Sequence, residues 1–351
     1  MRLTLFISSL LLVACSSGYA ITSRTKDTPL NQLSEVKTKL AFNCAHEKIP
    51  DPSAETSVLF DYARWLQKNN QLRQDKTIDV EIERLYRIAA ENNNYKANIN
   101  LQNGAMHDQF QLTSEERLRL SQQLIDANVA SGYYMIAIYL QKGTAGLQKD
   151  EDISLRYFRK AADEGSAQAQ TYVAKKLAPI DIAPEVARQM RSCAAEQGNG
   201  DAATALGVNL KTAKQYRAAL EAFQLGVAAG NETAAFFLEN GFQGQTVDNP
   251  LYFIDQKEDL ERVVRYKKIA KLLGNWSYAN PKVPEINEIV PLPPAKLPAW
   301  DGKLKWVEER EANIPPPKPS EALIEQLAKA MVLDPKTGKP LPGSPVYSKE
   351  D

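Results

Sequence analysis

Short segments rich in alanine and glycine recur along this chain at a nearly constant step, and this recurrence is the feature that most constrains its fold. The clearest copy, AADEGSAQA, spans residues 161–169, and AAEQGNGDA at 194–202 and AAENNNYKA at 89–97 resemble it closely. Looser copies are NVASGYYMI at 128–136 and GVAAGNETA at 226–234. A period of this length indicates an array of repeated helical units.

The central residue of each copy is expected to end a helix in the left-handed conformation, which is costly for a residue with a Cβ. These residues are Asn93, Gly132, Gly165, Gly198 and Gly230, at steps of 39, 33, 33 and 32 residues. The flanking alanines would let neighbouring helices approach closely, and stacking would complete a core that one helix pair cannot bury alone. They are Ala89, Ala90, Ala161, Ala162, Ala194 and Ala195.

Residues 139–169 resemble the Sel-like repeat, a relative of the tetratricopeptide repeat, and the weaker resemblance covers roughly 80–245. It implies an all-α, right-handed solenoid of helix pairs. One extra residue between the two loop glycines departs from the usual pattern of this family. The residues that carry the resemblance are Tyr139, Gly143, Gly146, Leu147, Lys149, Asp150, Tyr157, Lys160, Ala161, Ala162 and Gly165.

The N-terminus reads as a signal peptide. Arg2 precedes an apolar run at 3–14, which is shorter than the 20 or so residues that a membrane-spanning helix needs. The run ends in Leu-Val-Ala-Cys, which resembles the lipobox of bacterial lipoproteins and implies cleavage before a lipidated Cys15. Ser16, by the same resemblance, favours the outer membrane. The alternative is an ordinary secretory peptide with an incidental cysteine.

Two cysteines remain if Cys15 carries lipid. Cys44 and Cys193 would then lie in an oxidising compartment, where an even pair can form a disulfide. Two separate buried thiols are the alternative, because sequence alone does not fix the distance between the two Cα atoms. The predicted organisation is a signal peptide with the lipidated cysteine (1–15), a polar tether (16–40), a helical array (41–245) and a C-terminal region (246–351).

The C-terminal region begins with a helical pattern and then becomes rich in proline. Residues 283–302 contain five prolines, and the four closely spaced ones at 291–298 forbid a helix and favour extended structure, but the segment also contains many apolar side chains. We therefore predict an extended segment lying on the solenoid, with Trp300 and Trp306 as anchors; a flexible spacer is the alternative. Ser320 is suited to N-cap a short helix, and most of 335–351 is expected to be disordered.

Several function classes have little support in the sequence. The 43 basic and 43 acidic residues balance, so no net field favours nucleic acid. His46 and His107 are the only histidines, and Cys44, His46 and Glu47 have no second cluster with which to form a zinc site. There is no Gly-rich phosphate loop and no Gly-x-Ser-x-Gly elbow. We therefore predict no metal, cofactor or catalytic residue.

The mature chain as a whole resembles an uncharacterised family of Gram-negative lipoproteins. This second resemblance implies a periplasmic immunity protein against a phospholipase effector of type VI secretion. It rests on the phrases NCAHEKIP, LYRIAAENNNYKANINLQN, SCAAEQGNGDA, IVPLPPAKLPAWDG and LDPKTGKPLPG.

The functional prediction is a non-enzymatic, membrane-tethered solenoid that binds a protein partner. The alternatives are a general envelope scaffold for cell-wall or secretion complexes and, with least support, an enzyme acting on envelope polymers. Candidate binding anchors follow two of the repeat turns, although both aromatic pairs also suit the core. They are Tyr133, Tyr134, Phe236 and Phe237.

Overall fold

The computed structural model describes residues 40–179 and 182–347 of the 351-residue chain. The described residues from 42 onward form one compact unit. The other unit, Met1–Ala41, lies almost wholly outside the described residues. The signal peptide, the lipidation of Cys15 and the tether at 16–40 also lie outside them, apart from Leu40, and stay predictions. No described helix is long and apolar enough to cross a membrane.

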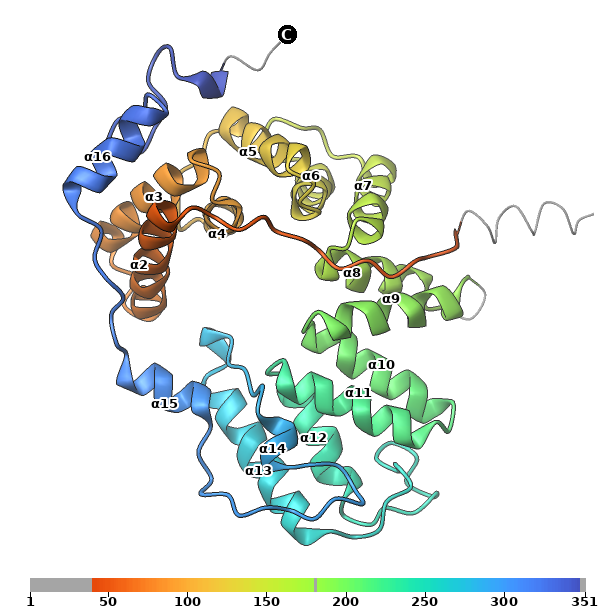
Figure 1. Cartoon of the computed structure of the whole chain (residues 1–351). Coiled ribbons are helices and arrows are strands. Elements are labelled where there is room, and N and C mark those ends of the chain that lie inside the picture. The colour runs from red at the N-terminus through yellow and green to blue at the C-terminus, as the bar shows by residue number, and fades with distance from the viewer. Residues whose placement is uncertain (1–39, 180–181, 348–351) are drawn as a thin grey trace, which may run out of the picture. The chain divides into compact units, whose positions relative to one another are not determined.

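The described part of the chain is an α-solenoid, as predicted. From α2 to α13 each helix packs mainly on its neighbours in the chain (Figure 1), which is the contact pattern of a repeat array. Two 3-10 turns and an isolated bridge between Leu333 and Pro340 complete the described secondary structure. In chain order the α-helices are α2 (Ala54–Asn70), α3 (Lys76–Glu91), α4 (Tyr95–Met106), α5 (Ser114–Asp126), α6 (Ser131–Lys142), α7 (Glu151–Asp163), α8 (Ala167–Leu177), α9 (Pro184–Glu196), α10 (Gly200–Thr212), α11 (Tyr216–Ala228), α12 (Glu232–Gly241), α13 (Leu260–Asn275), α14 (Ile286–Ile289), α15 (Lys305–Ala312) and α16 (Glu321–Ala330).

Short turns with a common design follow α3, α5, α7, α9 and α11. In the turn after α7, the N–H of Ser166 donates to the carbonyl of Ala161 at 2.9 Å, which closes the helix end. The side chain of Ser166 then accepts from the N–H of Ala169 and so caps α8. The residues in the left-handed region are Asn93, Asn128, Gly165, Gly198 and Gly230.

The prediction for Gly132 was wrong. Gly132 lies in the first turn of α6, and Asn128 takes the left-handed position in its place, with φ 57°. A Cβ at Gly132 would lie 2.7 Å from the carbonyl oxygen of Ser121 and 2.8 Å from the backbone nitrogen of Ile125. Glycine is therefore needed here because α5 and α6 approach closely, and not because of the backbone angle.

The flanking alanines are buried at the ends of their helices, where neighbouring helices meet. Ala161 and Ala162 contribute to one core with Phe158 of α7 and Val173 of α8. Such small side chains let the helices of successive pairs come close, while larger ones such as Phe158 fill the space beside them. The six are Ala89, Ala90, Ala161, Ala162, Ala194 and Ala195.

Most of the proline-rich segment is extended and packs on the end of the helical array, as predicted, but Ile286–Ile289, just before the four closely spaced prolines, form the short helix α14. Trp300 packs against the core of α11–α13, and the ring of Trp306 meets that of Trp276 edge to face. Two arginines of α13 hold the segment by its carbonyls. Arg262 donates to Pro291 and Ala295 at 2.8 and 2.6 Å. Arg265 donates to Ile289 and Pro298, both at 2.7 Å.

The last part of the chain returns to the first helices (Figure 1). Asn313, just after α15, accepts hydrogen bonds from Trp65 and Asn69 of α2, both at 3.0 Å. Side chains of α16 then enter the core formed by α2–α5, and α16 lies against α3. Arg84 of α3 pairs with Glu321 of α16 at 2.7 Å. The C-terminal region thus bonds to both ends of the array.

The expectation of disorder for most of 335–351 differs from the structure, which describes residues up to 347. Gly338 is seated on α3: a Cβ there would lie 3.0 Å from the carbonyl oxygen of Arg84. Arg84 also donates to the carbonyl of Pro335 at 2.6 Å, and Ser344 donates to Met331 at 2.6 Å. These contacts order the segment although its composition is polar and rich in proline. Residues 348–351 lie outside the described part.

Candidate protein-binding surface

An extended N-terminal strap, residues 42–50, lies along the helices before and after the Gly165 turn. Phe42 is buried in the core of α6–α9. Cys44 is joined to Cys193 of α9 by a disulfide, so the pairing that the sequence leaves open is formed. The carbonyl of Ala45 accepts a hydrogen bond from Gln170 of α8 at 2.9 Å. The strap is therefore attached by an apolar side chain, a covalent bond and its own main chain.

Glu47 of the strap supplies a helix cap that the local sequence lacks. The N-cap of α6 is Ala130, which has no side chain to cap the helix, and the carboxylate of Glu47 accepts from the N–H of Ser131 at 2.5 Å. The N–H of Glu47 in turn donates to Gln197 at 3.0 Å. Burial raises the pKa of Glu47 above its usual value, because desolvation outweighs the hydrogen bonds from Ser131.

We expect Glu47→Ala to lower the free energy of unfolding by about 1 kcal/mol, because the N-terminus of α6 loses its acceptor. Glu47→Gln keeps an acceptor for Ser131 and is the matched control. A raised carboxyl pKa means that the folded state binds this proton more tightly than the unfolded state, so the contribution of Glu47 to stability falls as pH rises through the folded pKa. Urea unfolding at pH 4 and pH 7 measures the free energy of unfolding of both proteins. Glu47→Gln should become more stable relative to wild type as pH rises. The same difference in stability at both pH values would contradict the raised pKa of Glu47.

The Cys44, His46 and Cys193 ligand atoms lie within 4.8 Å of one another. Both sulfurs are used in the disulfide, and zinc is bound by thiolates. Nδ1 or Nε2 of His46 would be left as one imidazole ligand, and His46 instead pairs with Glu196 at 3.4 Å on the exposed surface. The cluster therefore acts as the covalent attachment of the strap.

Extended segments of the chain cover two of the repeat turns. A Cβ at Gly165 would lie 2.6 Å from the backbone nitrogen of Glu47 and 2.6 Å from the carbonyl carbon of His46. A Cβ at Gly230 would lie 1.8 Å from the carbonyl oxygen of Pro281. The absence of a side chain at these glycines thus makes room for the main chain of a distant segment, in addition to allowing the left-handed turn.

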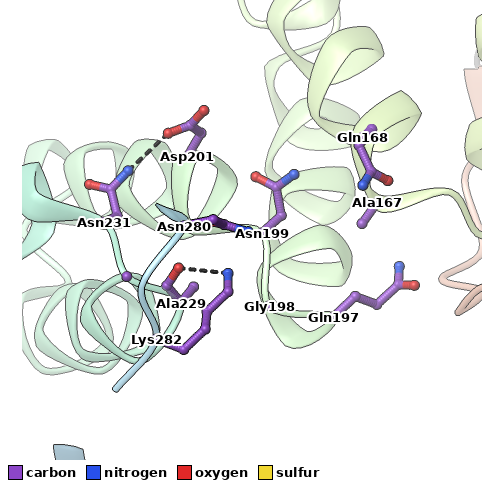
Figure 2. Close-up of a pocket in the computed structure, with 12 residues that line it drawn as sticks. Ala167, Gln168, Gln197, Gly198, Asn199, Asp201, Ala229, Asn231, Asn280 and Lys282 are labelled. Carbon is purple, nitrogen blue, oxygen red and sulfur yellow. Dashed lines mark hydrogen bonds between the residues drawn. The ribbon is translucent and has the colours of Figure 1, made fainter. Parts of the chain in front are cut away.

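The turn between these two is open. Gly198 has φ 80°, is exposed, and has no atom within 4 Å of where a Cβ would be. It lines a pocket of about 320 Å³, which we call the Gly198 pocket. Figure 2 shows Gln168 and Gln197 on one side of it and Asn231 and Lys282 on the other. The complete lining is Ala167, Gln168, Gln197, Gly198, Asn199, Gly200, Asp201, Ala229, Gly230, Asn231, Asn280 and Lys282.

The candidate aromatic anchors are only partly available to a partner. Tyr133 and Tyr134 are half-buried against the core of α6–α9, where the ring of Tyr134 meets that of Phe158. Phe237 stacks on the buried ring of Phe223, with centroids 4.9 Å apart. Phe236 is 44% exposed and points its ring toward Tyr252 in the loop after α12. Of the four, Phe236 offers most surface, and its binding role stays a prediction.

The side chains that hold the strap and those that line the pocket were not predicted from the sequence. For Asn199 and Asn231 the available signal was an Asn directly after the left-handed glycine of a turn, since that position both caps the next helix and lies beside the turn. The missed strap residues are Glu47, Gln170 and Gln197, and the missed pocket residues are Gln168, Asn199, Asn231, Asn280 and Lys282.

Both a family model and several solved structures are similar to this chain. Residues 234–341 match a family model described as a domain of unknown function (DUF6396). Immunity protein Pa5087 from Pseudomonas aeruginosa has a similar structure, with a TM-score of 0.55 and 24% identity over 72% of this chain and 95% of that chain. The chain shares the fold of an immunity protein. Immunity protein PA5088 from the same organism gives a TM-score of 0.56 and 24% identity over 72% and 94% of the two chains.

A more distant structural neighbour is a Sel1 repeat protein from Oxalobacter formigenes. The two are 18% identical over 59% of this chain and 86% of that chain, with a TM-score of 0.42. No curated protein matches this chain in sequence.

Proposed function

We propose that this chain is a lipid-anchored periplasmic immunity protein that binds and neutralises a secreted phospholipase toxin of a type VI system, without catalysing a reaction itself. The observation that carries the proposal is the fold shared with Pa5087 and PA5088 over nearly their whole length. The resemblance of the sequence to a family of type VI immunity lipoproteins supports the same function and supplies the phospholipase as the partner.

The architecture is suited to gripping another protein. A solenoid presents a large, continuous surface of helix ends and turns. Here the strap and the C-terminal region bond to helices far away in the sequence, which reduces the freedom of the array. A surface that is already ordered binds at a lower entropic cost than one that must order on contact.

The proposed location agrees with the chemistry of the chain. The Cys44–Cys193 disulfide suits an oxidising compartment such as the periplasm. Lipid on Cys15 would contribute about 0.8 kcal/mol per buried CH₂, so several acyl chains would hold the protein at the outer membrane. The anchor would keep the inhibitor beside the lipid that a phospholipase attacks.

The test uses the phospholipase encoded beside the gene for this chain, directed to the periplasm of a host that lacks both genes. Co-expression of the wild-type chain is expected to restore growth, and the purified chain is expected to inhibit release of fatty acid from phospholipid vesicles. A Cys15→Ala variant should inhibit the purified enzyme equally but protect cells less. Absence of a neighbouring phospholipase gene, or full toxicity in the presence of the wild-type chain, would refute the proposal.

A further inference from the structure

Three consecutive turns of the array have the same geometry but different coverings. Gly165, Gly198 and Gly230 each follow a long helix in the left-handed region, at φ 109°, 80° and 82°. The main chain of His46 and Glu47 presses on the first turn, and that of Pro281 presses on the third. The middle turn has no such cover, and the Gly198 pocket lies there.

The covering segments are held through their main chains. The N–H of Glu47 donates to the amide oxygen of Gln197, and the carbonyl of Ala45 accepts from the amide of Gln170. On the other side, the N–H of Val283 donates to the carbonyl of Ala228 at 2.9 Å. Hydrogen bonds of this kind do not depend on the side chains of the segment that is bound.

The Gly198 pocket offers the same kind of groups. Within residues 40–179 and 182–347, the side-chain amides of Gln168 and Asn280 form no hydrogen bond, and Asn199 uses only its oxygen, to cap α10. Each of the two charged lining groups already makes one hydrogen bond, because Asp201 accepts from Asn231 and Lys282 donates to the carbonyl of Ala229 (Figure 2). The groups left for a ligand therefore include the amides of Gln168 and Asn280, which can both donate and accept, and the amide nitrogen of Asn199, which can donate.

We propose that the Gly198 pocket is a docking site for an extended segment of the protein partner, bound in the way that the strap binds the Gly165 turn. The proposal rests on the protein-binding function argued above and names the part of the surface that performs it. The pocket adjoins the two covered turns, since its lining residue Gln197 contacts the strap and its lining residue Gly230 contacts the segment at 281. Small-molecule sites are lined mainly by apolar and aromatic side chains, whereas this lining contains none larger than alanine.

The test begins with a display library of random twelve-residue peptides, from which those that bind the immobilised full-length chain are selected. The affinity of the selected peptides is then measured for wild type and for variants of the pocket. Gly198→Asn places a side chain in the pocket at a residue type that the chain itself uses in the left-handed position, at Asn93 and Asn128. It is expected to weaken the selected peptides at least about tenfold, because the side chain overlaps the bound segment.

A matched control is Gly343→Asn, which changes a glycine of φ 84° that also has no atom within 4 Å of a Cβ. It should leave the affinity within about twofold of wild type, since it is not part of the pocket. Gln168→Ala, which removes an exposed amide and should not disturb folding, is expected to weaken the peptides several-fold.

Failure to select any peptide, or equal binding of the selected peptides to wild type and to both pocket variants, would overturn the docking site. The growth assay with the phospholipase separates this result from the proposed function. Peptides that bind at the pocket of a chain that gives no protection would support the docking site and refute the immunity role. If wild type protects cells but the selected peptides bind Gly198→Asn as tightly as wild type, the immunity role is supported and the docking site is refuted.

Discussion

Replacing Gly230 with alanine is expected to lower the free energy of unfolding by about 2–5 kcal/mol. The backbone of Gly230 has φ 82°, where a Cβ alone costs about 1–2 kcal/mol. The new methyl would also lie 1.8 Å from the carbonyl oxygen of Pro281, so the segment would have to move away. That movement would break the hydrogen bond from Val283 to Ala228. It would also displace the buried side chain of Val283 from the core of α11–α13.

Gly198→Ala is the control, because Gly198 has nearly the same φ but no atom near the added methyl. It should cost only the backbone part, about 1–2 kcal/mol. Urea unfolding followed by circular dichroism gives both values. Equal losses for the two variants would show that contact with Pro281 adds nothing.

Reduction of the Cys44–Cys193 disulfide is expected to cost about 2–5 kcal/mol of stability. The bond joins residues 149 apart in the sequence, so it restricts a large part of the unfolded chain. Cys44 is exposed and accessible to dithiothreitol. Once reduced, the strap loses its covalent attachment, and hydrogen exchange should become faster at the amides of Glu47 and Ser131, which the strap protects.

The double variant Cys44→Ser, Cys193→Ser should match the reduced wild-type protein in stability and in exchange. It should also show no response to dithiothreitol, which controls for other effects of the reductant. A reduced protein as stable as the oxidised one, with unchanged exchange at Glu47, would show that the strap is held by its other contacts alone.

The repeat architecture could be predicted from sequence because its signals are local. Two alanines, then a glycine, then a capping Ser or Asn predict a single turn between helices. The constant step between copies predicts that the helix pairs stack. Gly132 was misjudged because a glycine serves two purposes that look alike in a sequence. It can allow a left-handed turn or a close helix contact, and Asn128 supplies the turn here because asparagine tolerates a positive φ.

The covering segments could not be placed from the sequence because extended chain has no period and its contacts are long-range. The strap meets helices more than eighty residues away, as the bond between Glu47 and Ser131 shows. Its position depends on backbone groups that every residue has. The same holds for the proline-rich segment, where the apolar content predicted burial but nothing indicated that Arg262 and Arg265 would hold its carbonyls.

The difference in stability between Gly165→Asn and Gly198→Asn tests most directly whether the chain covers one turn and leaves the next open. Asparagine at Gly165 must displace the main chain of His46 and Glu47, whereas asparagine at Gly198 enters free space. Gly165→Asn is expected to lose about 1–3 kcal/mol more of its free energy of unfolding than Gly198→Asn. Equal losses of stability in the two variants would contradict this prediction, because the two turns would then be either both covered or both open.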